Sequence, residues 1–232
     1  MTEPKPISLS HSSLQILQSC PLRYQMSRVE GRSRIGMTRG RRRGSAFSDA
    51  MEHRDPAKIE DAYDAWLMEA VSQDLVDDLV IERQVIAELY RAHAEYFGDD
   101  DEREIFFELP IKDAPGYLNR GYIDGVNFNG SSVRLEEDKL MMMWGRADEA
   151  ALMLNGQVLR YLGAAEQLYP DASELELRYR VTKYPGAYRK KDESPRQYAD
   201  KVISTIRTKL AKKPEELFVV NTIKLSDPAV RS

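Results

Sequence analysis

The sequence has one cysteine, three histidines and no long apolar run, and each shortage excludes a class of protein. Cys20 alone can form no intrachain disulfide, nor can this chain build a four-cysteine zinc or iron–sulfur site. No run of about eighteen apolar residues is present, and the N-terminal stretch MTEPKPISLSHSS lacks the basic-then-apolar order of a signal peptide. We therefore expect a water-soluble, cytoplasmic protein that does not enter a membrane.

The length and composition allow a substantial buried core. The chain has 232 residues, of which 42% are apolar and 31% are charged. This is enough for one large domain or for a core with appended helices. The composition is that of a globular protein, and neither an internal repeat nor a low-complexity segment is evident.

The charges are segregated along the chain, although the net charge of −4 by itself argues against nucleic-acid binding. Residues 28–43 hold seven arginines and one acid, residues 49–108 hold 19 acids and five basic residues, and residues 178–213 hold twelve basic residues and three acids. Segregation permits a local positive surface, although a solvated face or flexible loop explains the arginine run equally well. In the last segment four tyrosines interleave with the charges, a mixture suited to phosphate contacts and base stacking: Tyr179, Tyr184, Tyr188 and Tyr198.

Helix signals begin close to the N-terminus. Ser10 is a candidate N-cap for a helix that begins near His11 and is interrupted by Pro21. The glycine- and arginine-rich residues 31–44 are expected to form a loop. The sequence GSAFSDAMEH, residues 44–53, then predicts the start of another helix.

Two further segments show helical periodicity. Apolar residues recur at helical spacing in residues 57–73 and again in residues 78–97. His93 lies on the apolar stripe of the second segment, and no other candidate ligand stands at metal-binding spacing nearby. We therefore interpret His93 as a packed core histidine and not as a metal ligand.

The character of the chain changes at residue 103. Strand-like segments follow, with helix-like segments at 147–168 and 194–212; the strands are expected at 103–112, 117–126, 131–140, 174–184 and 216–225. This order predicts an α/β or α+β fold in which helices cover the faces of a sheet. We expect one compact unit, with a helical part over residues 1–102 and the core over residues 103–232.

A predicted hairpin within residues 121–145 carries charged residues where its strands should be most buried. Alternate side chains share a face of a strand, so Glu137 and Lys139 project together from a face that is otherwise apolar. Hairpin pairing places Asp124 beside Glu137. Two neighbouring carboxylates repel each other, and burying them is costly unless a cation lies between them.

A hard divalent metal ion is one answer to this repulsion. Mg²⁺ needs about one or two protein carboxylates and takes further oxygens from water and phosphate, which suits this small ligand set. Lys139 could then orient a water or a phosphate, or act as a base if its pKa is lowered. Edge strands also carry charges and such patterns arise by chance, so a structural role for these residues stays open.

Four segments together resemble one family. SLSHSSLQILQSCPLRYQM, GSAFSDAME, GYIDGV with VRLEEDK, and QVLRY are similar, in order, to the motifs of the PD-(D/E)XK nuclease superfamily, in its RecB-like exonuclease branch with the CRISPR-adaptation and phage nucleases. The resemblance spans residues 8 to about 165. It implies a restriction-endonuclease-like core, with a central mixed sheet flanked by helices and a helical N-terminal elaboration.

The resemblance also implies roles for single residues. Asp124 and Glu137 would bind Mg²⁺ or Mn²⁺, and Lys139 would be the catalytic lysine. Gln157 and Tyr161, one helical turn apart, would hold the active site or the DNA strand, although a simple surface pair is the competing interpretation.

Two departures from the family pattern stand out. The family's helix histidine falls at Ser48, which is a poor metal ligand. Glu52 lies four residues further, on the same helix face, and is our candidate for the missing ligand; His53 points elsewhere and is the weaker candidate. Cys20 matches one cysteine of the iron–sulfur members, but no later cysteine follows, so we expect no cluster.

The resulting expectation is a metal-dependent DNA exonuclease of phage or bacterial recombination, replication or repair, acting on single strands or duplex ends. The residues expected to contact the DNA backbone are Arg39, Arg41, Arg42, Arg43, Arg189, Lys190 and Lys191. An inactive DNA-binding protein on the same scaffold is the main alternative. A plain interaction protein, with its hairpin acids exposed, is the third.

Overall fold

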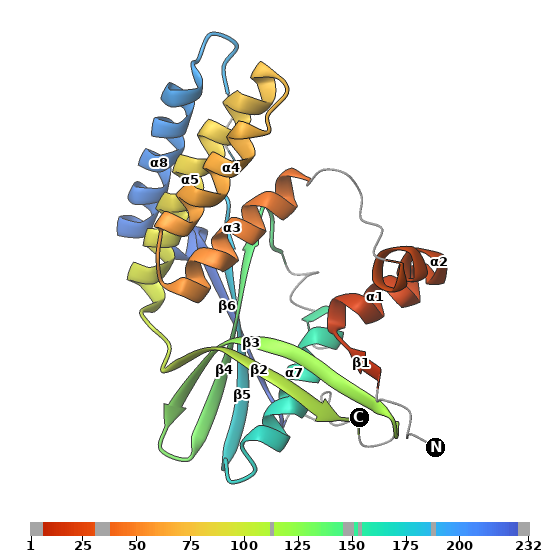
Figure 1. Cartoon of the computed structure of the whole chain (residues 1–232). Helices are drawn as coiled ribbons and strands as arrows, with labels where there is room; N and C mark the ends of the chain where they lie inside the picture. Colours follow the sequence, from red (N-terminus) through yellow and green to blue (C-terminus); the bar gives the residue numbers. More distant parts are fainter. Residues whose placement is uncertain are drawn as a thin grey trace.

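A computed structural model describes residues 7–30, 38–111, 114–145, 151–152, 155–186 and 189–226 (Figure 1). The elements in chain order are β1 (Ile7–Leu9), α1 (His11–Ser19), α2 (Pro21–Tyr24), the π-helical turn η1 (Gln25–Val29), α3 (Arg39–His53), α4 (Ala57–Met68), α5 (Gln73–Phe97), β2 (Glu102–Pro110), β3 (Tyr117–Asn129), β4 (Ser132–Met141), α7 (Gly156–Leu168), β5 (Glu174–Lys183), α8 (Pro195–Lys212), the 3-10 turn η2 (Pro214–Glu216) and β6 (Phe218–Lys224).

The strands form one mixed sheet. Its order is β1-β3-β4-β5-β6, and β2 pairs with the other edge of β3. β1 runs parallel to β3 and β4 runs parallel to β5, whereas the remaining pairs are antiparallel. β3 is the longest strand, because one of its edges serves β4 at residues 125–129 and β1 at residues 117–119.

Polar caps fix where most helices begin. Ser10 accepts a hydrogen bond from the Ser13 backbone at the start of α1, as the sequence predicts. Ser72 and Asn155 cap α5 and α7 in the same way. At α8, Ser194 and Gln197 form a reciprocal capping box.

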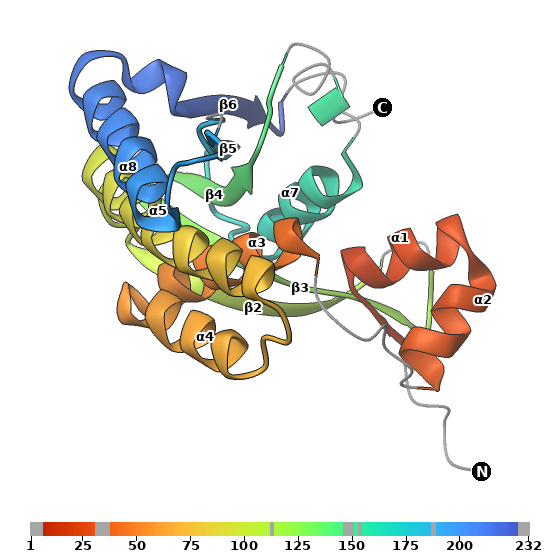
Figure 2. The same cartoon turned by 90° about the horizontal axis from the view of Figure 1, so that it is seen from above.

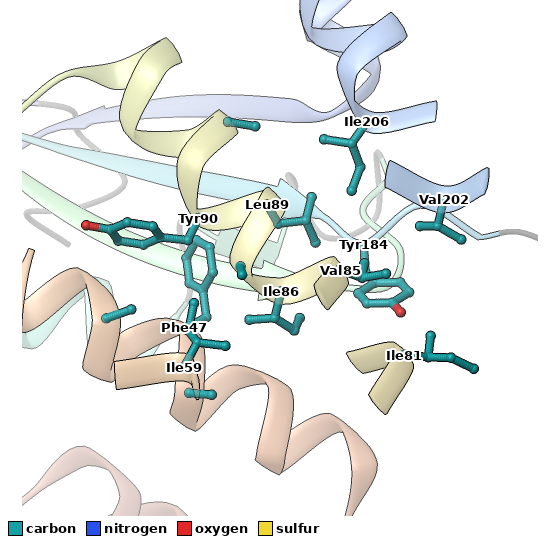
Figure 3. Packing of buried hydrophobic residues seen from close by; sticks show 14 of the residues in the cluster. Phe47, Ile59, Ile81, Val85, Ile86, Leu89, Tyr90, Tyr184, Val202 and Ile206 are labelled. Carbon is teal, nitrogen blue, oxygen red and sulfur yellow. The ribbon is translucent and has the colours of Figure 1, made fainter. Parts of the chain in front are cut away.

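Two apolar clusters hold the helices to the sheet. One cluster lies between the sheet and α7 and includes Phe107, Ile123 and Leu162. The other joins α3, α4, α5 and α8 and includes Phe47, Ile86 and residues that Figure 3 shows in close packing. Figures 1 and 2 show α1 and α2 on the opposite side of the molecule from α4, α5 and α8.

The expected fold class is confirmed, since a mixed sheet is flanked by helices and preceded by N-terminal helices. Three details differ. Helix α3 begins at Arg39, where Thr38 caps it, so the predicted loop over residues 31–44 is wrong at its C-terminal end. The short strand β1 was not predicted. Within the segment 147–168, the long described helix begins only at Gly156.

Part of the predicted basic surface cannot be placed in the fold. Residues 31–37 of the basic segment and Tyr188 lie outside the described residues. In the part of the chain that the structure describes, no helix is long and apolar enough to cross a membrane.

Candidate active site

The charged residues of the hairpin lie where β3 and β4 separate. The two strands are paired from Asn129 and Ser132 up to Gly125 and Glu136. The next positions are Asp124 on β3 and Glu137 on β4, so they face each other at the point of divergence. This proximity is what the hairpin pattern predicts.

Glu137 is completely buried, and only one of its two carboxylate oxygens has a hydrogen-bond partner among the described residues. Its Oε1 atom accepts a hydrogen bond of 2.6 Å from Gln157 Nε2 on α7 and forms an ion pair with Lys139. Its Oε2 atom has no hydrogen-bond partner among the described residues. Burial, reinforced by the Asp124 carboxylate, raises the pKa of Glu137 to about 8. An additional positive charge at this site would therefore stabilise the ionised carboxylate.

Asp124 is held by the strand opposite. Its Oδ2 atom accepts a hydrogen bond of 2.8 Å from the backbone N–H of Asp138. Desolvation raises the pKa of Asp124, although Lys139 opposes the rise. Asp124 and Glu137 therefore form a repulsive carboxylate pair, and the ammonium of Lys139, which pairs with Glu137, attracts both charges.

Lys139 is cationic in this setting. Burial lowers its pKa, but the carboxylates of Glu137 and Asp124 outweigh that effect and raise the pKa above its ordinary value. Of the roles that the sequence left open, orienting a water or phosphate therefore fits this geometry better than acting as a base.

The helix α7 supports the site from one side. Gln157 Nε2 also lies 3.0 Å from the Tyr161 hydroxyl, to which it donates a hydrogen bond. Tyr161 is buried and packs edge-on against Phe107 of β2. The two residues thus share one helix face, as their spacing predicts, and Gln157 orients the Glu137 carboxylate.

Glu104 is a third carboxylate that sequence reasoning missed. Its neighbours Arg103 and Ile105 pair with Gly125 and Ile123, so Glu104 lies opposite Asp124. Its backbone has a φ of 50°, a left-handed value that is costly for a residue other than glycine and that clusters at functional sites. Burial, with the charges of Asp124 and Glu52, raises the pKa of Glu104 to about 7.

No sequence signal distinguishes Glu104 from the other acids of its strand. Glu102 lies two residues before it and Glu108 four residues after it. Such even spacing is what a solvent-exposed face of a strand produces. Only the strand pairing with β3 and the unusual backbone angle single it out.

A cavity of about 410 Å³ opens at this point between α3 and the sheet. Side chains that line it include Arg41, Ser48, Glu104, Asp124, Asp138 and Lys139. Ser48, where the family pattern has a histidine, therefore faces the same cavity as two of the carboxylates.

Glu52 lies beside this cavity rather than in its lining. It is exposed on α3 and borders a neighbouring hollow with Ser48 and Asp49. Ligand atoms of Asp49, Glu52 and His53 lie within 4.8 Å of one another on this surface, so His53 stands closer to Glu52 than the helical angle suggests.

A buried polar network supports the back of the site. Arg180, on β5, donates hydrogen bonds to Asp138 at 2.6 and 2.7 Å and to Asp100 at 2.9 and 3.0 Å. His93 is fully buried; its Nδ1 lies 2.8 Å from Thr182 Oγ1 and its Nε2 3.3 Å from Asp138 Oδ1. The core position expected for His93 is confirmed, and its contact with Asp138 connects it to the site.

Most of the arginines at the start of α3 serve the fold. Arg39, Arg42 and Arg43 all form ion pairs with the buried Glu82 of α5. Arg43 is itself buried, and its guanidinium lies 4.1 Å from the centre of the Tyr184 ring. Arg41 is exposed and is the member of this group that lines the cavity.

The C-terminal basic segment is also largely paired. Arg189 contacts Asp77 at 3.3 Å, whereas Lys190 and Lys191 are exposed. Tyr179 and Tyr184 are buried, so the prediction that these two rings stack on bases is wrong. Strand tyrosines fill the core here because β5 is covered on both faces.

The donor set fits a hard divalent cation. Asp124, Glu104 and Glu137 offer carboxylate oxygens, the ligands that Mg²⁺ and Mn²⁺ prefer, and one buried oxygen of Glu137 has no hydrogen-bond partner in the described part of the chain. Three carboxylates around one lysine leave a local excess of negative charge.

Comparison with known proteins agrees with this geometry. The crystal structure of a "putative exonuclease" from Eubacterium rectale superposes with a TM-score of 0.52 at 12% identity, covering 97% of this chain and 87% of that one, and so shows a shared fold. No curated protein matches the sequence. A family profile described as the PD-(D/E)XK nuclease superfamily matches residues 8–221, from β1 into β6. The chain belongs to the PD-(D/E)XK nuclease superfamily.

Proposed function

We propose that this protein is a metal-dependent DNA exonuclease that acts in recombination, replication or repair. The observation that carries the proposal is the fully buried Glu137, which has one unpartnered oxygen and lies opposite Asp124 and beside Lys139. A structural protein gains nothing from such a pair, because buried like charges reduce stability. The Eubacterium rectale protein of similar fold, described as a "putative exonuclease", is consistent with this choice of activity.

The carboxylates of Asp124, Glu137 and Glu104 would hold Mg²⁺ or Mn²⁺. The bound ion would polarise the scissile phosphate and lower the pKa of a nearby water. Hydrolysis forms a bond from that water's oxygen to phosphorus and releases one ester oxygen, which takes up a proton.

The chain's own residues would organise the rest of the reaction. The Lys139 ammonium stabilises the negative charge that develops on the phosphate oxygens. Gln157 fixes the orientation of Glu137, with the hydroxyl of Tyr161 holding the amide in turn. Arg41, which is exposed and lines the cavity, would contact a phosphate of the bound strand.

An inactive DNA-binding scaffold is the second candidate, motivated by Ser48 at the position of the family histidine. Glu104 weighs against it, because a third carboxylate already lines the cavity into which that histidine would point. The two candidates differ in one property, which is hydrolysis.

End-labelled linear and circular DNA should be digested with Mg²⁺, with Mn²⁺ and with EDTA. We expect metal-dependent shortening of linear DNA by the wild type and none by Glu137→Ala or Lys139→Ala. Glu174→Ala is the matched control, since this exposed carboxylate lies at the start of β5 and pairs with Lys224. DNA binding by the wild type without cleavage under any metal would favour the inactive scaffold.

A further inference from the structure

Two exposed aromatic rings form a pair on the open face of the β2–β3 ribbon. Phe106 and Tyr122 are direct partners in the strand register, and their ring centres lie 5.1 Å apart. They are 48% and 49% exposed, which is unusual for large rings in the middle of two strands. Arg120 lies two residues before Tyr122 on β3, and its guanidinium carbon is 6.0 Å from the centre of the Phe106 ring.

This pair is continuous with the carboxylates of the candidate active site. Glu104 and Asp124, which line the cavity, stand two residues along the strands from Phe106 and Tyr122. Phe107 and Ile123 point the other way, into the apolar cluster against α7. Along the β2–β3 ribbon the carboxylate pair and the aromatic pair are therefore neighbours, about 7 Å apart.

We propose that Phe106 and Tyr122, with Arg120, form a stacking platform for unpaired bases of the DNA strand whose phosphate is hydrolysed at the neighbouring carboxylates. The proposal rests on the proposed nuclease function and adds the substrate class, a single-stranded or unpaired end. Aromatic faces bind bases of any sequence, but only when the bases are not paired in a duplex.

Arg120 places a cation beside the rings. It is exposed and stands opposite Glu108 in the strand register, and within the described ranges no ion pair joins it to that or another carboxylate. Its guanidinium is therefore available to a phosphate or to the face of a base. The burial of Tyr179 and Tyr184 removes two of the four rings that the sequence suggested for stacking, and Tyr198 is half-buried on α8. Phe106 and Tyr122, by contrast, adjoin the site directly.

A purely structural role predicts a different result. Cross-strand aromatic pairs stabilise a ribbon without any ligand, so their removal would then lower stability and leave DNA affinity unchanged. Binding and thermal stability must therefore be measured on the same variants.

The test is fluorescence anisotropy with a labelled single-stranded oligonucleotide, a blunt duplex of the same sequence and an abasic strand of the same length. Ca²⁺ replaces Mg²⁺ to suppress cleavage. The variants are Phe106→Leu, Tyr122→Leu and Arg120→Gln. The matched control is Phe128→Leu, because Phe128 is 43% exposed and packs edge-on against Tyr169 at the far end of β3.

We expect each ring variant to bind the single strand about fivefold to tenfold more weakly, with less than a twofold change for the duplex and the abasic strand. Arg120→Gln should weaken binding to the single strand as well. Because it leaves both rings in place, it tests the proposed platform even if a ring variant does not fold. Unchanged binding of the single strand, or an equal loss with Phe128→Leu, would overturn the platform.

The outcome separates the platform from the nuclease. If the wild type cuts DNA with metal but the ring variants bind the single strand normally, the platform alone fails. If the wild type neither binds nor cuts any DNA, the proposed function fails too.

Discussion

Removal of the buried Arg180 should destabilise the protein strongly. Its side chain is 1% exposed and forms four hydrogen bonds to two carboxylates, those of Asp100 and Asp138, while Glu136 lies 3.4 Å away. The substitution Arg180→Met keeps much of the volume but leaves these carboxylates without their cation. Arg103 remains 2.9 Å from Asp100 but 4.0 Å from Asp138, so it compensates the loss only in part.

The expected loss is about 3–5 kcal/mol, the range seen when one partner of a buried ion pair is removed. With a urea dependence of about 2–3 kcal/mol per molar, the unfolding midpoint should fall by about 1–2.5 M. Equilibrium unfolding in urea, followed by circular dichroism, measures this shift directly.

Arg178→Met is the matched control. Arg178 lies two residues earlier on the same strand, is 23% exposed, and contacts Glu136 at 3.5 Å. Its loss should cost less than about 1 kcal/mol, because Glu136 keeps Arg134 at 2.8 Å and Arg180 at 3.4 Å. If Arg180→Met fell within about 1 kcal/mol of the wild type, or matched Arg178→Met, the network could not be what holds Asp138 in place.

Three further predictions concern the site and its strands. In differential scanning fluorimetry, Mn²⁺ at about one hundred times its Kd should raise the wild-type Tm by about 5 °C or more. Glu137→Gln should abolish most of this rise, and an undiminished rise would exclude Glu137 as a ligand. Ser48→His should increase the affinity for Co²⁺ relative to Mg²⁺ in calorimetric titrations, because it adds an imidazole to the cavity; an unchanged ratio would mean that position 48 does not reach the ion. Gly125→Ala should lower the free energy of unfolding by about 1–3 kcal/mol, because the new Cβ would meet Asp100 Cγ at 2.7 Å. A Cβ at Gly163 in α7 would meet no described atom within 4 Å, so Gly163→Ala should be neutral or stabilising. Equal effects of the two variants in chemical unfolding would contradict the contact with Asp100.

The hairpin was predictable because its information is local. Alternation along β4 places Glu137 with Lys139, and pairing across the turn places Asp124 opposite Glu137, so a short stretch of sequence contains most of the geometry. Helix starts were predictable for the same reason, since Ser10 and Ser194 cap the helices that follow them.

The missing parts depend on contacts between distant segments. Glu104 joins the site only through the pairing of β2 with β3. The arginines of α3 look like a loop in sequence, yet the buried Glu82 of α5 holds them in a helix. β1 is three residues long and exists only because it pairs with β3, so no periodicity could reveal it.

The central claim is that the carboxylates at the point where β3 and β4 separate hold the metal ion. Crystals grown with Mn²⁺ and measured near the manganese absorption edge would locate the ion by its anomalous scattering. We predict a peak bordered by the carboxylates of Asp124, Glu137 and Glu104. A peak confined to the surface group of Asp49, Glu52 and His53, or no peak at saturating Mn²⁺, would contradict the account.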